Sequence, residues 1–447
     1  MDVRQFPNRQ LLGWAVVVFL TIALPGPTGA IENDGHGGAV KSVAVAPDGA
    51  RAVTAGFDYS LIVWNLTDSS VLRRMIGHDA AVNSVVILPN GVQALSGSDD
   101  GTLILWDFAR GRLLHRFKGH VGKVAAVAVS DNGRFALSGG WDRTVRLWDL
   151  QDRRQIRVLK GHQSNVNTVA FSTAGDEIIS GSYDGTLRTW RRRDGTQQSV
   201  MTGHGFGVNW VAVASKNRLA ASASIDKSVR IWDMQSGKER QVLLGQDGPV
   251  FAVAISPDSR HVVSGGRDGR IGIWELGGER TRRFLPGHAG IVWSIAFTPD
   301  GRRFLTAGAD AVVRIWDLRS GHQLGTLGTT GRTPAPVTAN DGGRGAKLFR
   351  TCAACHTLEP EGGFKAGPTL YGLFGRRAGT VSGYPYSDAL KHAKIVWTEK
   401  TVDALFSVGP ETLTPGSKMP LQRMTSAKDR SDLIKYLKQV TAKDAAR

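Results

Sequence analysis

Two thiols and an imidazole lie close together in the segment RTCAACHTLEP, at Cys352, Cys355 and His356. These are the only two cysteines in a chain of 447 residues. Two thiols one helical turn apart reach the two vinyl groups of a porphyrin as thioethers, and the next residue then offers its imidazole to the iron. A zinc site would need further thiols or clustered histidines, and a thioredoxin-like pair would need a βαβ context. The spacing therefore predicts one covalently bound haem c.

The segments around this motif extend the prediction. GRGAKLFRTCAACH reads as a short amphipathic helix, and GPTLYGLFGRRAGT, YPYSDAL, PGSKM and DLIKYLK follow it in that order. In this order they resemble the small single-haem class I cytochromes c of the mitochondrial and bacterial c2 type, from Gly342 to about Thr441. The resemblance implies a small all-α domain over residues 342–447 and a role in electron transfer.

The same resemblance implies roles for individual residues. Met419, which lies 63 residues after His356, matches the distal sulfur ligand of the iron, and a thioether opposite an imidazole raises the reduction potential. The carbonyl of Pro368 matches the acceptor of the His356 N–H. The side chains that match positions holding a haem propionate are Arg376, Tyr386 and Trp397. The matched crossing between the first and last helices involves Gly345, Phe349, Leu433 and Tyr436.

Two positions depart from the family pattern. Phe406 stands where many relatives carry a tyrosine that hydrogen-bonds the methionine sulfur, and Leu390 stands where an asparagine often orders an internal water. A drier cavity disfavours the extra charge of ferric haem, so we expect a raised potential and less support for the Met419 bond. Met424 is the alternative methionine, although it lacks the PGSKM loop.

A 42-residue period organises the chain before the haem motif. The tryptophans at this spacing are Trp64, Trp106, Trp148, Trp190, Trp232, Trp274 and Trp316, and each has an aspartate six residues and a hydroxyl residue ten residues before it. Each unit opens with Gly-His, except that Gln246 replaces the histidine in the sixth. Within a unit, four short alternating segments separated by turn residues predict a four-stranded antiparallel sheet.

These units resemble WD40 repeats, whose Gly-His and Trp-Asp pairs and period of about 40 match. The resemblance covers about residues 35–328 and implies a seven-bladed all-β propeller. It also implies that each histidine bridges the turn aspartate and the strand hydroxyl, which accepts from the tryptophan. We interpret these Asp–His–Ser sets as structural, not catalytic, and expect a weaker network around Gln246. The C-terminal side should supply the last outer strand, Gly321–Gly328.

WD40 propellers act mostly as binding surfaces, which predicts a protein-docking face at the Gly-His loops and turns. Trp141 and Tyr183, at turn tips, are the candidate docking residues. Packing between blades is the alternative role for the aromatics of this face, whose other members are Phe57, Arg267 and Phe206 and, near the starts of inner strands, Trp210, Phe251 and Trp293. In the second domain, residues 342–447 hold 17 Lys and Arg against nine Asp and Glu. Its basic residues, among them Lys365 and Lys418, would steer an acidic redox partner.

The N-terminus predicts export. A polar segment with two arginines precedes an apolar run of 14 residues, Leu11–Leu24, and PGPTGA follows. This is the layout of a signal peptide over residues 1–30, with an uncleaved membrane anchor as the alternative. No later segment is apolar enough to span a bilayer. We therefore expect a periplasmic protein, for which the basic pI of about 10.2 points to acidic protein partners and not to nucleic acid.

The predicted organisation is a signal peptide (1–30), a seven-bladed WD40 propeller (31–328), a Pro- and Gly-rich linker (329–341) and a cytochrome c domain (342–447). The leading function is electron transfer through one haem ligated by His356 and Met419, without a catalytic site in the chain. The alternatives are an enzyme whose propeller is catalytic and fed by the cytochrome, a haem peroxidase or sensor if Met419 is displaced, and a scaffold in which the haem is secondary. The sequence does not determine the oligomeric state.

Overall fold

A computed structural model describes residues 35–173, 175–214, 218–277, 282–328, 343–353, 356–360, 367–384, 386, 388–414 and 424–442. The predicted signal peptide and linker lie outside these residues. So do four of the predicted site residues, Cys355, Lys365, Lys418 and Met419. No helix in the described part of the chain is long and apolar enough to cross a membrane.

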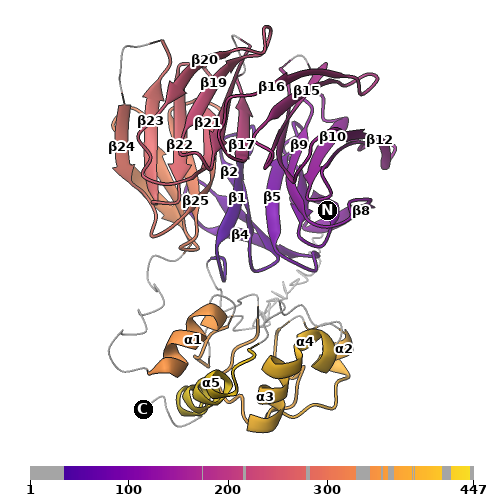
Figure 1. Cartoon of the computed structure of the whole chain (residues 1–447), viewed down its shortest axis with the longest axis vertical. Coiled ribbons are helices and arrows are strands. Elements are labelled where there is room, and N and C mark those ends of the chain that lie inside the picture. The colour runs from indigo at the N-terminus through magenta and orange to yellow at the C-terminus, as the bar shows by residue number, and fades with distance from the viewer. Residues whose placement is uncertain are drawn as a thin grey trace, which may run out of the picture. The chain divides into compact units, whose positions relative to one another are not determined.

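The first described unit is a propeller of seven antiparallel four-stranded sheets, shown in Figure 1. Blades one to three comprise β1 (Val40–Val45), β2 (Arg51–Gly56), β3 (Ser60–Asn65), β4 (Val71–Ile76); β5 (Val82–Ile87), β6 (Gln93–Ser98), β7 (Thr102–Asp107), β8 (Arg112–Lys118); and β9 (Val124–Val129), β10 (Phe135–Gly140), β11 (Thr144–Asp149), β12 (Arg154–Lys160). Blades four and five comprise β13 (Val166–Phe171), β14 (Glu177–Ser182), β15 (Leu187–Arg191), β16 (Gln197–Met201); and β17 (Val208–Val213), β18 (Leu219–Ser224), β19 (Val229–Asp233), β20 (Glu239–Leu243). Blades six and seven comprise β21 (Val250–Ile255), β22 (His261–Gly266), β23 (Arg270–Glu275), β24 (Arg282–Pro286); and β25 (Val292–Phe297), β26 (Arg303–Gly308), β27 (Val313–Asp317), β28 (Gln323–Leu327).

Every blade uses four strands that are consecutive in the sequence, and the seventh ends on β28. The predicted origin of the last outer strand on the C-terminal side is therefore confirmed. The innermost strands form a closed ring in which β1 packs against both β5 and β25. Val43 N donates to Ser294 Oγ at 3.2 Å, which ties the first blade to the seventh. In Figure 1 the inner strands β1, β5 and β17 run through the middle of the propeller, and outer strands such as β24 and β12 lie at its margins.

The hydrophobic core of the propeller lies between blades. Seven clusters of buried residues each join two successive blades, and the cluster around Trp64 and Leu305 joins the first to the seventh. Sheets that are apolar on both faces must be covered on both faces, and neighbouring blades do this for each other. Trp148 is 1 % exposed, and burying a tryptophan contributes at most about 5 kcal/mol by area. Closure of the ring therefore leaves no blade with an open face.

The second described unit is helical. It comprises α1 (Arg344–Ala353), α2 (Asp388–Lys391), α3 (Glu399–Val408), α4 (Pro410–Leu413) and α5 (Ala427–Val440). Side-chain caps start the two longer C-terminal helices, since the hydroxyl of Thr398 accepts from Thr401 N and that of Ser426 accepts from Asp429 N. Helices α1 and α5 pack against each other, and α3 packs against α5.

The contact between α1 and α5 depends on Gly345. A Cβ at this position would lie 2.2 Å from Asp432 O and 2.6 Å from Tyr436 Cβ. The rings of Phe349 and Tyr436 are 5.6 Å apart, and Leu433 is fully buried beside them. The predicted crossing of the first and last helices is confirmed.

Candidate functional site

The haem motif lies at the C-terminal end of α1. Cys352 is buried in the core of the helical unit, and its carbonyl accepts from His356 N at 2.9 Å. This bond continues the helical turn and places His356 one turn beyond Cys352. The spacing in the sequence therefore places a thiol and an imidazole on adjacent turns of the chain. Cys355 lies outside the described residues.

A second chain segment sets the orientation of His356. Its Nδ1 lies 2.8 Å from Pro368 O, so that Nδ1–H donates to this carbonyl and, in the neutral ring, the proton is on Nδ1. Leu370 N donates to Thr357 O at 2.8 Å, which holds the two segments together. The neighbouring Gly367 is close to the ring as well, because a Cβ there would lie 2.2 Å from His356 Cε1. The contact between His356 and Pro368 implied by the family resemblance is present, whereas Gly367 was not singled out from the sequence.

Arg376, Tyr386 and Trp397 occupy one region of the helical unit. Gly375 N donates to Trp397 O at 2.8 Å and Trp397 N donates to Arg376 O at 2.9 Å, which joins two extended segments. The Arg376 guanidinium donates to the carbonyls of Tyr371 and Thr369, both at 2.7 Å. Burial lowers the pKa of Arg376, opposed by the charge of Tyr386.

Arg376 is thus a half-buried cation whose hydrogen-bond acceptors within the described part of the chain are neutral carbonyls. A desolvated cation with neutral acceptors suits an anionic group from outside the chain. Burial raises the pKa of the neighbouring Tyr386, which keeps its phenol a hydrogen-bond donor. The Arg376 cation and the Tyr386 phenol are therefore suited to bind the propionate carboxylates of a porphyrin.

The two departures from the cytochrome pattern lie on α3 and at the end of α2. Phe406 is 5 % exposed in the core, and its carbonyl accepts from Met424 N at 2.8 Å. Met424 packs against the same core. Leu390 is half-buried. A phenylalanine at position 406 offers no hydroxyl to a ligand sulfur, so the local environment is apolar, as the sequence indicated.

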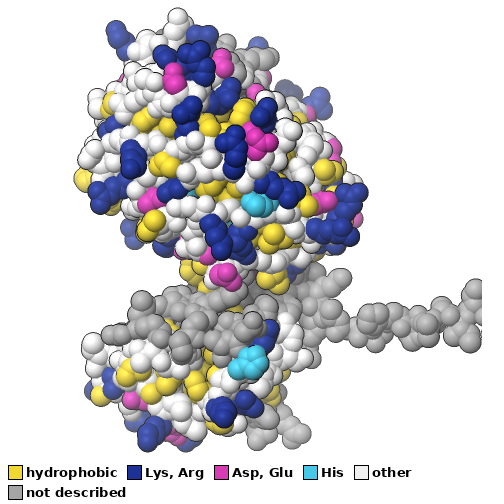
Figure 2. Space-filling model, turned by 90° about the vertical axis from the view of Figure 1, so that its right-hand side faces the viewer, with side chains coloured by type: hydrophobic (Ala, Val, Ile, Leu, Met, Phe, Trp, Pro, Cys, Tyr) yellow, Lys and Arg dark blue, Asp and Glu magenta, His cyan; other side chains and the backbone are white. Residues whose placement is uncertain are grey.

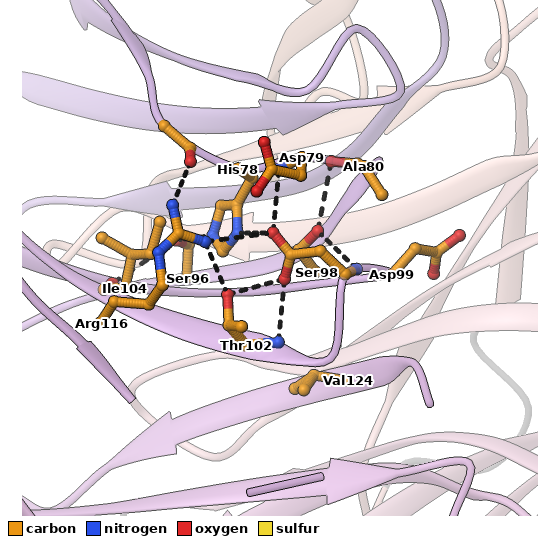
Figure 3. A network of polar contacts seen from close by, with 12 residues as sticks. His78, Asp79, Ala80, Ser96, Ser98, Asp99, Thr102, Ile104, Arg116 and Val124 are labelled. Atoms are coloured by element: carbon orange, nitrogen blue, oxygen red, sulfur yellow. Dashed lines mark hydrogen bonds and ion pairs between the residues drawn. The ribbon is translucent and has the colours of Figure 1, made fainter. Parts of the chain in front are cut away.

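The repeated polar residues of the propeller form the predicted network, which Figure 3 shows for the second blade. His78 Nδ1 lies 2.8 Å from Asp100 Oδ2, and His78 Nε2 lies 2.7 Å from Ser96 Oγ, which accepts from Trp106 Nε1 at 2.8 Å. Thr102 N and Oγ1 also donate to Asp100, at 2.8 and 2.7 Å. Every polar atom of the chain Trp–Ser–His–Asp has a partner.

In the six blades with a Gly-His histidine, the surroundings of the network aspartate favour its ionised form. Burial works to raise the pKa of Asp100, but the hydrogen bond and charge of His78, with the hydroxyl of Thr102 and the N–H of Asp79, hold it well below its usual range. Because the ionised Asp100 is an acceptor only, His78 Nδ1–H donates to it. The same direction of pKa shift holds in the other blades with a Gly-His histidine, at Asp58, Asp142, Asp184, Asp226 and Asp310.

The geometry supports a structural role for these sets. In the six blades with a Gly-His histidine, the histidine–hydroxyl distance is 2.7–2.8 Å. The hydroxyl residue is fully buried in all seven blades, as Ser138 is in the third. A nucleophile needs access to substrate and a free base, whereas here the hydroxyl is enclosed and already accepts from a tryptophan.

The sixth blade has a weaker network, as its glutamine predicts. In the amide orientation that satisfies both neighbours, Gln246 donates to Asp268 at 3.1 and 3.2 Å and accepts from Ser264 Oγ at 3.1 Å. Trp274 Nε1 lies 3.1 Å from the same hydroxyl, whereas the equivalent distance in the other blades is 2.7–2.9 Å. The network keeps its connectivity with longer bonds.

The candidate docking residues Trp141 and Tyr183 lie in the turns β10–β11 and β14–β15. They are 46 % and 56 % exposed, and Phe206, in the loop before β17, is 68 % exposed. Large aromatic side chains at such exposure favour a binding role over packing between blades. Lys123 Nζ lies 4.7 Å from the Trp141 ring centroid and 2.7 Å from Asp99 Oδ2.

The fold and the site define a protein that combines a seven-bladed WD40 propeller with a helical haem-binding unit. The family model described as "WD domain, G-beta repeat" matches residues 30–65, 69–107, 111–149, 153–191, 195–233, 237–275 and 279–317. These matches cover more than half of the chain, so the protein belongs to the WD40 repeat family. A second family model, "Cytochrome c", matches residues 343–441.

Curated relatives match the C-terminal part. Cytochrome c of Gibberella zeae is 48 % identical over 99 residues, which are 22 % of this chain and 92 % of the relative. Cytochrome c of Chlamydomonas reinhardtii is 46 % identical over 111 residues, 25 % of this chain and 98 % of the relative. Cytochrome c of Theileria parva is 44 % identical over 108 residues, 24 % of this chain and 92 % of the relative. The C-terminal part is a cytochrome c domain, with a haem c cofactor and electron transfer as its function, and the propeller is a protein-interaction domain.

Proposed function

We propose that the protein is an exported electron carrier with one haem c, held by Cys352 and Cys355 and ligated by His356 and Met419. In this proposal the propeller docks the protein partner with which the haem exchanges electrons. The observation that carries the proposal is the 2.8 Å contact between His356 Nδ1 and Pro368 O, one turn beyond the buried Cys352. It orients the ring of the motif histidine and holds it in place.

The chain supplies binding and orientation. The haem, when bound, supplies the one-electron couple. The carbonyl of Pro368 fixes the tautomer of His356, and Arg376 with Tyr386 offers a cation and a phenol to the propionates. The core around Phe349, Phe406 and Leu433 excludes water, which favours the less charged ferrous state and raises the potential.

Methionine ligation rests on the PGSKM segment that contains Met419 and on the resemblance to class I cytochromes. Replacing Met419 with leucine should abolish the far-red methionine–iron absorption band of the oxidised protein and open the iron to carbon monoxide. Met424→Leu is the matched control, because Met424 packs in the core beside Phe406. Loss of the band in the Met424 variant alone would show that Met424, and not Met419, is the iron ligand.

Export rests on the N-terminal layout over residues 1–30 and implies the periplasm. Cell fractionation followed by haem staining should locate the protein there, and N-terminal sequencing of the mature chain should begin near Ile31. A haem-stained band that remains in the membrane with an intact N-terminus would favour the uncleaved anchor.

The docking role rests on the exposed aromatic turns of the propeller and on the basic residues of the cytochrome domain. Trp141→Ala and Tyr183→Ala should reduce electron transfer to the partner while the haem spectrum stays unchanged. Lys365→Gln and Lys418→Gln should lower the association rate, with most of the effect at low salt. Unchanged transfer in both aromatic variants would remove these turns from the docking surface.

A further inference from the structure

Every innermost strand of the propeller carries a β-bulge at the same position. In the first blade Val40 pairs with Gly56 and Ser42 with Ala55, which leaves Lys41 as the extra residue. The seven bulged residues, called here the bulge ring, are Lys41, Asn83, Ala125, Asn167, Asn209, Phe251 and Trp293. All seven are half-buried. A bulge re-aims a side chain, and here it does so once in every blade.

The blades differ in what they place at this position. Asn83, Asn167 and Asn209 each donate to a backbone carbonyl of the next blade, at 3.0, 2.9 and 2.8 Å, so they hold the ring together. The third blade has only an alanine. Blades six, seven and one are neighbours around the ring, and they carry Phe251, Trp293 and Lys41 instead. A comparison of the seven repeats therefore separates the asparagines, which hold neighbouring blades together, from the contiguous group of Phe251, Trp293 and Lys41.

The three divergent residues contact one another. Lys41 Nζ lies 3.0 Å from the centroid of the Trp293 ring, and the rings of Trp293 and Phe251 are 5.0 Å apart in an edge-to-face arrangement. In the described part of the chain, no acceptor is recorded for the buried Trp293 Nε1, and no hydrogen-bond acceptor is recorded for Lys41 Nζ. Two neighbouring donors thus have no acceptor in the described part of the chain, and this calls for an explanation.

The carboxylate whose charge acts on Lys41, Asp99, already has other donors. Asp99 accepts from Asn83 Nδ2 and from Lys123 Nζ, both at 2.7 Å. Burial lowers the pKa of Lys41 to about 8, with the charge of Asp99 raising it and that of Lys123 lowering it. The Lys41 ammonium is therefore charged at neutral pH and desolvated, and no described carboxylate is hydrogen-bonded to it.

Side-chain contacts connect the bulge ring to the exposed aromatic turns, through Asn83 and Asp99. Lys123, which pairs with Asp99, also lies over the ring of Trp141, one of the candidate docking residues. Figure 2 shows Lys and Arg side chains spread over the propeller face in view, and the whole chain carries a formal net charge of +17. A chain with this excess of positive charge attracts an acidic partner segment.

We propose that the bulge ring binds a carboxylate side chain from an extended acidic segment of the protein partner, with Lys41 as its counter-charge and Trp293 and Phe251 as its apolar wall. The proposal rests on the docking role given to the propeller above and names the chemistry of the partner. The carboxylate supplies the acceptor that the ammonium lacks, and the Trp293 N–H is the neighbouring donor. Charge-assisted bonds in such a desolvated setting are strong and specific.

The test uses the full haem-loaded protein and a fluorescein-labelled peptide of alternating glycine and glutamate, with binding followed by fluorescence anisotropy. Lys41→Met should weaken binding by roughly tenfold, whereas Lys41→Arg should retain it. Lys238→Met is the matched control, since Lys238 is an exposed lysine in the turn between β19 and β20. The wild-type affinity should fall as the pH rises through about 8, because the ammonium loses its charge, and the Lys41→Arg variant should not show this fall.

Equal binding by the Lys41→Met and Lys238→Met variants would overturn the proposal. So would equal binding of a glycine–glutamine peptide, or preferential binding of inorganic phosphate or a single-stranded oligonucleotide. A measurement on the wild-type protein covers the case in which Lys41→Met fails to fold. After reductive methylation with carbon-13, the Lys41 resonance should titrate at a higher pH with the glutamate peptide than without it, and an unchanged titration counts against the site.

The failure of this inference can be told apart from failure of the proposed function. If Trp141→Ala impairs transfer to the partner and Lys41→Met does not, the docking role stands and the carboxylate site is wrong. If the haem spectrum lacks the methionine–iron band while the peptide binds through Lys41, the site stands and the proposed ligation is wrong.

Discussion

The propeller and the cytochrome domain satisfy their buried polar groups in different ways. In the propeller, the chain Trp148–Ser138–His120–Asp142 is complete within one blade, and the neighbouring blades cover its apolar faces. In the described part of the cytochrome domain, the half-buried Arg376 donates to neutral carbonyls, and the carbonyl of Pro368 orients the ring of His356. The comparison teaches that the polar network of a blade is complete within the polypeptide, whereas the cytochrome domain is built around a group that it must acquire.

Removing haem attachment should give the largest difference between the two units. In a variant with Cys352→Ser and Cys355→Ser, we expect the cytochrome domain to lose its helical structure, because its core lacks the group that it encloses. Circular dichroism should show loss of the helical signal with the β signal retained, and the thermal transition of the propeller should stay unchanged. A helical domain that stays folded without haem would contradict the comparison.

The crossing of α1 and α5 should be the most sensitive packing contact in the cytochrome domain. Gly345→Ala places a Cβ 2.2 Å from Asp432 O, so the helices must separate, and we expect a loss of about 3 kcal/mol in unfolding free energy. Gly343→Ala is the matched control, because nothing lies within 4 Å of a Cβ there. Urea unfolding followed by haem absorbance measures both variants, and equal midpoints would rule out the contact as a determinant of stability.

Two matched serine substitutions should measure the polar networks of the propeller. Ser138→Ala leaves the buried Trp148 N–H and His120 Nε2 without partners, which should cost about 2 kcal/mol. Ser264→Ala, in the sixth blade, removes bonds of 3.1 Å and should cost about 1 kcal/mol. Calorimetry of the propeller transition compares them. A larger shift for the Ser264 variant would reverse the ranking of the two networks.

Acid should weaken the propeller through its buried aspartates. Burial works to raise the pKa of Asp58, but His36 and Arg74 hold it well below its unfolded value of about 4. Asp58 therefore stabilises the fold above that pH, and its contribution is lost as the pH falls toward the folded pKa. Urea midpoints between about pH 2 and pH 5 should fall less steeply in Asp58→Asn than in the wild type. Identical slopes would mean that this carboxylate does not stabilise the blade.

Much of the fold was predictable because it repeats. The period of 42 residues predicted seven blades, the partners of each histidine and the weaker network at Gln246, since the same local sequence must form the same local contacts seven times. The haem motif was predictable because its chemistry depends on residues that are adjacent in the sequence. The role of Gly367 was not, because only folding brings it against the ring of His356.

The sequence alone determined the seven WD40 repeats, the C-x-x-C-H motif and the export layout, because each is a short-range pattern of residue types. Only the tertiary structure decided how positions far apart in the chain combine. Ring closure places Lys41, from the first blade, over Trp293, from the seventh, although 252 residues separate them in sequence. A bulge in each strand aims both side chains, and no local pattern reports a contact that depends on the last blade meeting the first.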